Sequence, residues 1–220
     1  MYAGQKKGAC LLLLVKAGEY GTLDKDMKTK TALANETEDL PGDFAIWIFI
    51  LAEMLVFGVM FIVYAFTRAS QVEVFNASQL TLSRGLGTLN TVILIASSYF
   101  VVRAVSAIKL GNSRSSAWWL IGTILLGGMF SAVKLWEFNQ KFSAGITLET
   151  NDFYMFYLTL TFFHLMHVLM GMIILACIVY KLRHGDYSAA EYTGVETGAS
   201  FWHMVDLLWI MLFPLIYIIH

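Results

Sequence analysis

The sequence predicts an all-α integral membrane protein built as a bundle of five transmembrane helices. Hydrophobic residues make up 58% of its 220 residues and charged residues only 14%, whereas soluble domains carry roughly a quarter charged residues. Five apolar runs are long enough to cross a bilayer, which takes about 20 residues in a helix. The formal net charge of −1 and the two distant cysteines, Cys10 and Cys177, indicate neither nucleic-acid binding nor a disulfide framework.

Residues 1–43 are the least membrane-like part of the chain and are predicted to form a mobile N-terminal arm. The apolar stretch 10–15 is too short to span a membrane, and residues 24–39 mix charges of both signs with Thr, Asn and Ala, a composition typical of disorder. We expect natural translation to begin at Met27, which makes residues 1–26 a translated extension. Pro41, Gly42 and Asp43 then lead into the membrane domain, residues 44–220.

The five predicted spans are residues 44–66, 86–107, 117–136, 153–179 and 198–219. The loops between them are short, so consecutive helices are expected to be neighbours in the bundle. Lys and Arg are concentrated in the arm and in the second and fourth loops. By the positive-inside rule, this bias predicts a cytoplasmic N-terminus and an external C-terminus.

The first two spans contain polar residues that need partners inside the bundle. Glu53 lies near the middle of the first span, where a carboxyl is costly enough to indicate either a structural hydrogen bond or a proton-linked role. The sequence leaves both open. In the second span, the polar side chains predict hydrogen bonds between closely packed helices. They are Asn90, Thr91, Ser97 and Ser98.

The third span ends with Lys134 and Glu137, which are three residues apart and can therefore pair on one helix face. We expect this pair at the outer interface, with Trp136 as an aromatic anchor and Lys134 extending its ammonium towards water. Small residues of the third and fourth spans suit close packing against another membrane protein. They are Gly122, Gly127, Gly128 and Gly171.

The fourth and fifth spans carry the histidines. His164 and His167 are three residues apart, so they share one helix face. Imidazoles at membrane depth are expected to face other protein rather than lipid. In the fifth span Glu196, His203 and Asp206 follow one another at spacings of seven and three, which predicts a polar strip along one helix face.

Imidazole binds iron, copper and zinc, so the intramembrane histidines raise the question of a metal site. His164 and His167 lie on one helix and cannot ligate a haem iron from opposite sides, and His203 is the one further intramembrane histidine before the C-terminal residue. We therefore favour neutral histidines hydrogen-bonded to carboxyls, with Glu53 as the natural partner. A metalloenzyme using these three histidines and a small transporter are the alternatives, although the polar positions are few and scattered for a transport pathway.

Together, these motifs resemble subunit III of haem-copper oxidases over residues 41–220. The resemblance rests on a mid-helix glutamate, a Leu-Asn-Thr opening of the second span, a glutamate closing the third, and a Phe-His-x-x-His-Val-x-x-Gly motif. They are Glu53, residues 89–91, Glu137 and residues 163–171. With five spans rather than seven, the chain resembles the ubiquinol-oxidase version and, more closely, the NorE-like proteins associated with nitric oxide reductase. Residues 40–43, 145–155 and 206–210 carry the NorE-like pattern.

The resemblance implies a non-catalytic accessory subunit of a respiratory haem-copper oxidase or nitric oxide reductase complex in a bacterial inner membrane. The implied partner is the catalytic subunit, which holds haem and either copper or non-haem iron, while this chain binds no cofactor and no metal. The implied role is to support assembly, stability or proton uptake. The alternative within the family is subunit III of a cytochrome c or quinol oxidase that reduces oxygen.

The resemblance also assigns roles to individual residues. Glu53 matches the family's buried carboxylate near subunit I, which is implicated in proton uptake, and His164 and His167 match its histidine pair. The family's other polar positions correspond to Glu137, Glu196, His203 and Asp206. Seven-helix members hold lipids in a cleft formed with two helices that this chain lacks, so that lipid site does not carry over. Independently of the resemblance, Arg84 and Arg103 are candidate contacts for phosphate headgroups at the surface.

Overall fold

The computed structural model describes residues 44–185, 187 and 191–219. In chain order the elements are α2 (Phe44–Ser70), α3 (Val72–Gln79), α4 (Arg84–Lys109), α5 (Ser113–Ser143), α6 (Asp152–His184), α7 (Thr193–Phe213) and the π-helical turn η1 (Pro214–Ile218). Five helices in this part of the chain are long and apolar enough to cross a membrane, the last formed by α7 and η1 together. The predicted fold class and the five spans are therefore confirmed. The predicted arm and the expected start at Met27 lie outside the described residues.

Polar N-caps set where three of the long helices begin. The side-chain oxygens of Ser83, Asn112 and Asn151 each accept a hydrogen bond from the backbone N–H three residues later, at the starts of α4, α5 and α6. Each bond satisfies one of the N–H groups that a helix start leaves unpaired. The helix α6 ends at Gly185, whose φ of 83° is a left-handed conformation that glycine adopts without steric cost.

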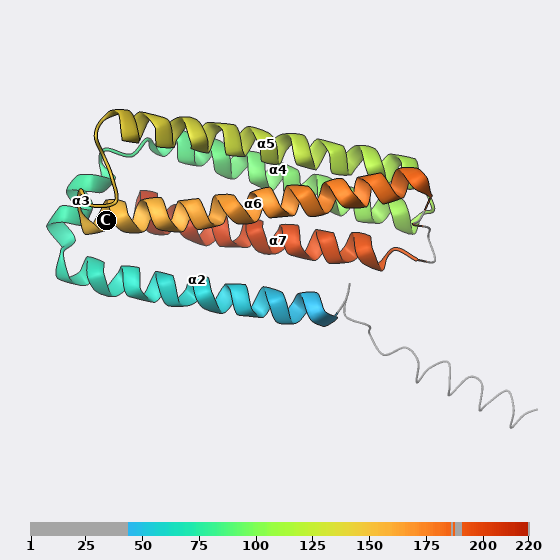
Figure 1. Cartoon of the computed structure of the whole chain (residues 1–220), viewed down its shortest axis with the longest axis horizontal. Helices are drawn as coiled ribbons and strands as arrows, with labels where there is room; N and C mark the ends of the chain where they lie inside the picture. The colour runs from blue at the N-terminus through green and yellow to red at the C-terminus, as the bar shows by residue number, and fades with distance from the viewer. Residues whose placement is uncertain (1–43, 186, 188–190, 220) are drawn as a thin grey trace, which may run out of the picture. The chain divides into compact units, whose positions relative to one another are not determined.

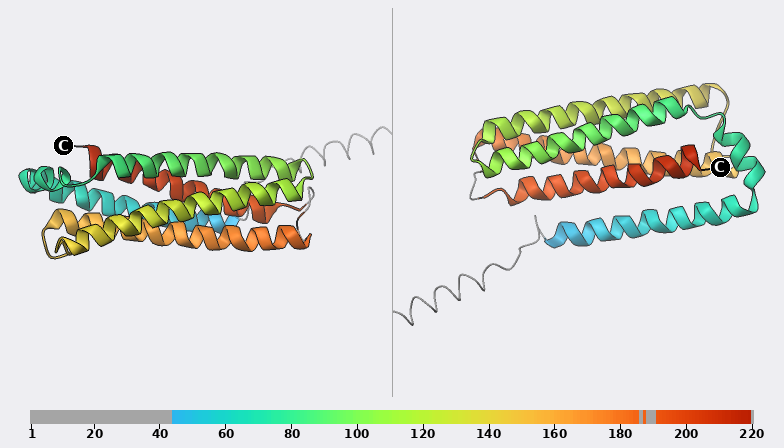
Figure 2. Two further views of the ribbon diagram at one scale, coloured as in Figure 1. Left: turned by 90° about the horizontal axis from the view of Figure 1, so that it is seen from above. Right: turned by 180° about the vertical axis from the view of Figure 1, so that it is seen from behind.

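Helices α4, α5, α6 and α7 form a closed four-helix bundle, in which each helix contacts the next and α7 returns to α4. Figures 1 and 2 show these four helices packed together, with α2 lying along the outside. The contacts of α2 are with α6 and α7. The expectation that consecutive spans are neighbours is therefore correct from α4 to α7 and wrong for α2.

The short helix α3, which lies in a predicted loop, explains the position of α2. Phe75 of α3 is fully buried, and Gln79 donates from Nε2 to the Ile216 carbonyl at 2.9 Å. Gln71, just before α3, donates to the Asp152 carboxylate at the start of α6 at 2.6 Å. These contacts hold α3 across the end of the bundle, as Figure 1 shows. Through α3 the chain therefore passes from α2, which lies beside α6 and α7, to the start of α4.

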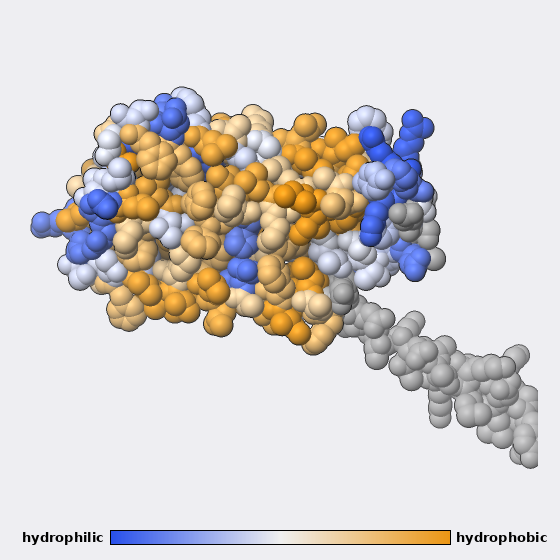
Figure 3. All heavy atoms as spheres, viewed as in Figure 1, coloured by the Kyte–Doolittle hydropathy of each residue, from blue (hydrophilic) through white to orange (hydrophobic). Residues whose placement is uncertain are grey.

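The contact between α2 and the bundle is narrow. Its buried residues are Ile50, Phe57 and Tyr64, and their spacing of seven places them on one stripe along the helix. The Tyr64 hydroxyl donates to the Leu215 carbonyl at 3.3 Å. Many other hydrophobic residues of α2 are exposed, and Figure 3 shows a broad apolar band between hydrophilic ends of the helices. Such a surface suits contact with lipid or with another membrane protein.

In the closed bundle, the Trp202 indole fills the space left by two glycines. Its Nε1–H donates to Ser97 Oγ at 3.0 Å. A Cβ added at Gly127 of α5 would lie 2.7 Å from the Trp202 ring, and one added at Gly171 of α6 would lie 2.9 Å from it. One side chain of α7 thus ties together α4, α5 and α6.

The glycines predicted to pack against another protein largely serve contacts within this chain. A Cβ on Gly122 would lie 2.8 Å from the Phe100 ring, whereas nothing lies within 4 Å of the corresponding position at Gly128. The prediction is therefore wrong for Gly122, Gly127 and Gly171. Small residues permit close approach of any neighbour, and here the neighbours are aromatic rings of the same bundle.

Candidate functional site

Glu53 and His167 form the polar contact between α2 and the bundle. His167 Nε2 lies 3.1 Å from Glu53 Oε2, and His167 Nδ1 lies 2.7 Å from the Phe163 carbonyl oxygen. The side chain of Glu53 is 24% exposed and that of His167 11%. Both residues lie well inside their spans, so the pair is at membrane depth and partly open. The predicted partnership of Glu53 with a histidine is confirmed for His167.

The geometry of this pair determines where its protons can be. A carbonyl oxygen can only accept, so the contact with Phe163 requires a proton on His167 Nδ1. The contact between His167 Nε2 and Glu53 Oε2 then holds one proton, carried either by Glu53 as a carboxylic acid or by His167 as an imidazolium. Both forms leave the pair neutral overall, which suits its depth in the membrane. Addition or removal of one proton would give the pair a net charge, which membrane depth disfavours.

His164 lies one turn from His167 but has a different environment. It is fully buried and its Nε2 lies 3.1 Å from the Val205 carbonyl of α7. That contact requires a proton on Nε2 and leaves Nδ1 with a lone pair, for which the described residues offer no hydrogen-bond partner. His164 is therefore a contact between α6 and α7 and not a second partner of Glu53.

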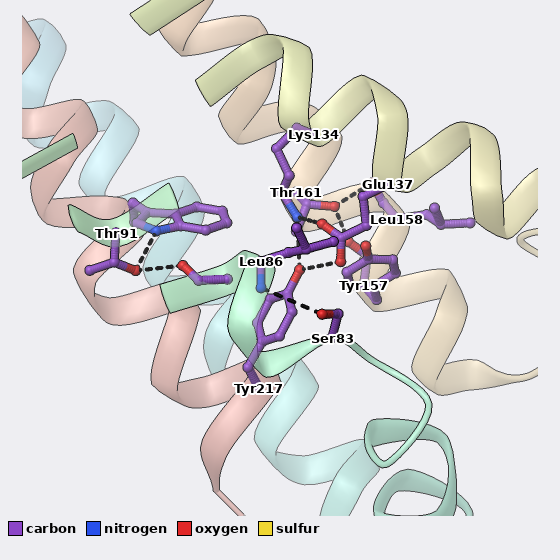
Figure 4. A network of polar contacts seen from close by, with 11 residues as sticks. Ser83, Leu86, Thr91, Lys134, Glu137, Tyr157, Leu158, Thr161 and Tyr217 are labelled. Atoms are coloured by element: carbon purple, nitrogen blue, oxygen red, sulfur yellow. Dashed lines mark hydrogen bonds and ion pairs between the residues drawn. The ribbon is translucent and has the colours of Figure 1, made fainter. Parts of the chain in front are cut away.

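Lys134 and Glu137 form an ion pair inside the four-helix bundle, closed by Tyr217 of η1 (Figure 4). The Lys134 ammonium donates to Glu137 Oε2 at 2.9 Å and to the Tyr217 hydroxyl at 2.8 Å. The same hydroxyl donates to Glu137 Oε1 at 2.9 Å. Side-chain exposure is 1% for Lys134 and 3% for Glu137. The three groups therefore satisfy one another in a closed ring of hydrogen bonds.

Aromatic rings surround the ammonium of this cluster. Lys134 Nζ lies 5.1 Å from the centroid of Trp209 and 5.3 Å from those of Tyr157 and Tyr217. The negative faces of such rings attract a cation, and the attraction is strongest where water is excluded. The rings therefore offset part of the cost of burying Lys134. Neither Tyr157 nor Tyr217 was identified from the sequence, although a tyrosine within a predicted span is a usable signal because its hydroxyl needs a partner when buried.

The predicted pairing of Lys134 with Glu137 is confirmed, but the predicted extension of the Lys134 ammonium towards water is wrong. Lys134 does not extend towards water, because it lies on the inward face of α5 at a spacing of four residues from Phe130 and Phe138, which are also buried. Trp136 lies on another face and is 52% exposed. An apolar run does not by itself reveal which face of the helix turns inward.

Glu196, His203 and Asp206 lie on α7, and the first two contact α4. Glu196 Oε1 pairs with Lys109 Nζ at 2.8 Å, and His203 Nδ1 lies 2.7 Å from Ser98 Oγ. Asp206 is only 4% exposed, and its carboxylate oxygens have no hydrogen-bond partner among the described residues. The predicted strip therefore joins α7 to α4 at two separate positions and does not converge on one site.

Further polar residues of α4 bond the indoles of α7. Thr91 Oγ1 accepts from Trp209 Nε1 at 3.0 Å, as Ser97 Oγ accepts from Trp202 Nε1. The interhelical hydrogen bonds predicted for these residues are confirmed. Asn90 is fully buried and, in the part of the chain that the structure describes, its amide finds no partner.

Arg84 and Arg103 lie towards opposite ends of α4. Nineteen residues separate them, or about 28 Å of helix, so they cannot bind the same headgroup. The guanidinium of Arg103 stacks over Trp119 at 5.4 Å from the ring centroid. Their contact with lipid headgroups stays a prediction.

The histidine donors do not fit a shared metal ion. His167 uses both ring nitrogens on Glu53 and Phe163, and His164 uses Nε2 on Val205. Over residues 44–185, 187 and 191–219, no three His, Cys, Asp or Glu side chains are grouped so that they could hold a metal.

Comparison with known proteins gives one consistent family. The family model described as cytochrome c oxidase subunit III matches residues 37–220. The chain is 31% identical over 193 residues to cytochrome c oxidase subunit 3 of Thermostichus vulcanus, covering 86% of this chain and 94% of that protein. It is 26% identical over 187 residues to cytochrome bo(3) ubiquinol oxidase subunit 3 of Buchnera aphidicola, covering 84% and 88%. It is also 27% identical over 181 residues to heme-copper oxidase subunit I+III of Aeropyrum pernix, covering 80% of this chain and 22% of that protein.

Proposed function

This chain belongs to the cytochrome c oxidase subunit III family, and from that premise we propose that it is a non-catalytic accessory subunit. It is a multi-pass membrane protein, subunit III of a haem-copper oxidase. Its proposed task is to sustain the assembly, the stability or the proton uptake of the catalytic subunit beside it. The proposed location is the bacterial inner membrane.

The observation that carries this proposal is the Glu53–His167 pair. Its hydrogen bonds hold a single proton between two ionisable groups at membrane depth, and Glu53 is 24% exposed. A group that exchanges a proton with a neighbour must be reachable from that neighbour. A catalytic subunit docked against the open side of α2 would lie next to this pair, which makes proton uptake the function most directly tied to a named site.

The partner is proposed to be the subunit I that holds the redox centres. A relative from Aeropyrum pernix is named a combined subunit I+III, and this chain corresponds to 22% of its length. Haem and metal are assigned to that partner and none to this chain. In support of this assignment, His164 and His167 engage protein acceptors with three of their four ring nitrogens.

The decisive test compares the purified complex with and without this chain, following haem content, initial rate and decay of activity during turnover. The expected result is full haem content, a reduced but measurable initial rate, and faster decay when the chain is absent. Complete loss of the initial rate at full haem content and intact partner subunits would assign a catalytic group to this chain. Identical rate, decay and assembly would leave the accessory role without support.

Within the family we propose the NorE-like branch, in which the partner complex reduces nitric oxide. The motifs at residues 40–43, 145–155 and 206–210 support this assignment. The competing candidate is an oxygen-reducing oxidase, favoured by the names of the Thermostichus and Buchnera relatives. Purifying the tagged chain from its native membrane and identifying the catalytic subunit that accompanies it decides between them. Recovery of a cytochrome c or quinol oxidase subunit I would overturn the NorE-like assignment.

A further inference from the structure

Two arginines meet at one surface cavity where α5 begins and α6 ends. Arg114 lies in the first turn of α5 and Arg183 in the last turn of α6. Both line a cavity of about 490 Å³ whose other walls are Ser113, Ala117, Trp118 and Leu182. Both arginines are exposed, and no hydrogen bond or ion pair engages either guanidinium among the described residues. Two positive charges thus line one cavity, and the residues that the structure describes pair with neither of them.

The walls of this cavity become less polar towards the middle of the span. Trp118 follows Arg114 by four residues, which places it about 6 Å deeper along the helix. Trp118 is 63% exposed, and tryptophan is the residue that membrane proteins place at headgroup level. Charge at the helix end and apolar surface below it match the polarity of a phospholipid.

A second cavity continues in the same direction along α6. It has a volume of about 510 Å³ and is lined by Ile173, Ala176, Cys177, Tyr180 and Lys181. Ile173, Ala176 and Tyr180 precede Arg183 by ten, seven and three residues, so they lie on the same face of the helix. This face offers an apolar path about 15 Å long leading away from Arg183, suited to the first part of an acyl chain.

We propose that this surface binds one anionic phospholipid, with its phosphate between Arg114 and Arg183 and an acyl chain along α6. Guanidinium groups bind phosphate oxygens in paired, charge-assisted hydrogen bonds. A zwitterionic headgroup would bring its own cation to a cavity that already holds two, so an anionic lipid such as phosphatidylglycerol is favoured. The site shares no residue with the Glu53–His167 pair or with Arg84 and Arg103, and it does not depend on the proposed function.

Photo-crosslinking in the assembled complex tests the proposal at the residues concerned. Phosphatidylglycerol and phosphatidylcholine, each with a photoreactive acyl chain, are added separately, and crosslinks to residues 173–181 are counted per copy of the chain. Phosphatidylglycerol is expected to crosslink on the order of 25-fold more than phosphatidylcholine, since each of the two juxtamembrane arginines contributes on the order of a fivefold preference. The double variant R114Q/R183Q is expected to lose this preference. Lys109→Gln removes an exposed cation at the same end of the bundle that already pairs with Glu196, and it should keep the preference.

The other outcomes overturn the proposal in distinguishable ways. Equal crosslinking by the two lipids, or an unchanged preference in R114Q/R183Q, would show that the two arginines do not bind the lipid phosphate. An equal loss with Lys109→Gln shows general attraction to a basic surface. Displacement of the lipid by millimolar inorganic phosphate identifies a free-anion site. Loss of R114Q/R183Q from the complex, with unchanged crosslinking per remaining chain, identifies an acidic partner protein. The lysine variant R114K/R183K retains the charge and should keep part of the preference, which separates binding from any effect on folding.

Discussion

The Glu53–His167 pair and the Lys134–Glu137 pair are built in opposite ways. Glu53 and His167 join a peripheral helix to the bundle, and the Glu53 side chain is 24% exposed. Lys134 and Glu137 lie on one helix inside the closed bundle, with exposures of 1% and 3%, and Tyr217 completes their hydrogen bonds. The first pair shares one proton and is partly open to a neighbour. The second is closed by its own partners and by aromatic rings, so its role is to hold α5 and η1 together.

The contrast shows that an ionisable residue within a span is not in itself a functional signal. Intramembrane carboxyls are costly wherever they lie, and in the structure both Glu53 and Glu137 lie within transmembrane helices. What separates them is access from outside the chain, which depends on whether their helix packs along one stripe or is enclosed by neighbours.

Breaking the enclosed pair should have the largest effect. Glu137→Ala leaves the Lys134 ammonium and the Tyr217 hydroxyl buried without their acceptor, and loss of one partner of a buried pair costs about 3–5 kcal/mol. We expect a loss of this size in the free energy of unfolding, measured in mixed micelles. The triple variant K134M/E137L/Y217F removes all three polar groups at similar volume and should be close to the wild type. If the triple variant is as unstable as Glu137→Ala, the three polar groups stabilise the fold by more than pairing with one another.

Crowding the Trp202 ring should have the next largest effect. An added methyl at Gly127 or Gly171 would lie 2.7 or 2.9 Å from that ring, and overpacking of this kind typically costs about 1–3 kcal/mol. Gly128→Ala is the matched control, because it lies on the same helix with nothing within 4 Å of the new methyl. If unfolding measurements give Gly127→Ala and Gly128→Ala the same stability, Trp202 does not pack tightly against Gly127.

Substitutions at the open pair should change stability by no more than the glycine variants do, and they should change turnover more. Glu53→Leu leaves His167 without its partner, which costs on the order of 1–3 kcal/mol, whereas Glu53→Gln keeps a polar partner and should cost less. Both variants lose the shared proton, so both should slow proton uptake by the complex, measured as turnover at equal subunit content. If Gln and Leu assemble equally well and leave turnover unaffected, Glu53 is neither a structural contact nor proton-linked.

The smallest expected effect is on the haem spectrum. His164→Gln and His167→Asn should leave the haem bands of the assembled complex unchanged, because both histidines bond protein oxygens. Absorption spectra at equal subunit stoichiometry are the measurement. A lost or shifted haem band in either variant would contradict the assignment of all redox centres to the partner.

The sequence predicted the spans well, because long apolar runs have no other stable location than a membrane or a core. The partnership of Glu53 with a histidine was also predictable, because polar groups at this depth need partners and few are available. Which of the two histidines pairs with Glu53 was not predictable, because His164 and His167 share a helix face. Only the position of α2 determines that His167 is the one next to Glu53. That position depends on α3, whose eight residues carry no strong apolar periodicity. Tyr217 was missed because its contact with α5 spans 80 residues of sequence.

The docking of α2 against α6 and α7 also sets an order of events during synthesis. Among the five spans α2 leaves the ribosome first, and it packs against α6 and α7, which leave last. The hydrogen bond between Tyr64 and Leu215, for example, joins residues 151 positions apart. Until α7 is inserted, α2 has little of its own chain to pack against, and its stripe of Ile50, Phe57 and Tyr64 faces lipid or the insertion machinery. Until α6 is made, Glu53 is without His167, and the neutral carboxylic acid is the form that the bilayer tolerates best. The Glu53–His167 pair can therefore form only after three later spans, α4, α5 and α6, have followed α2 out of the ribosome.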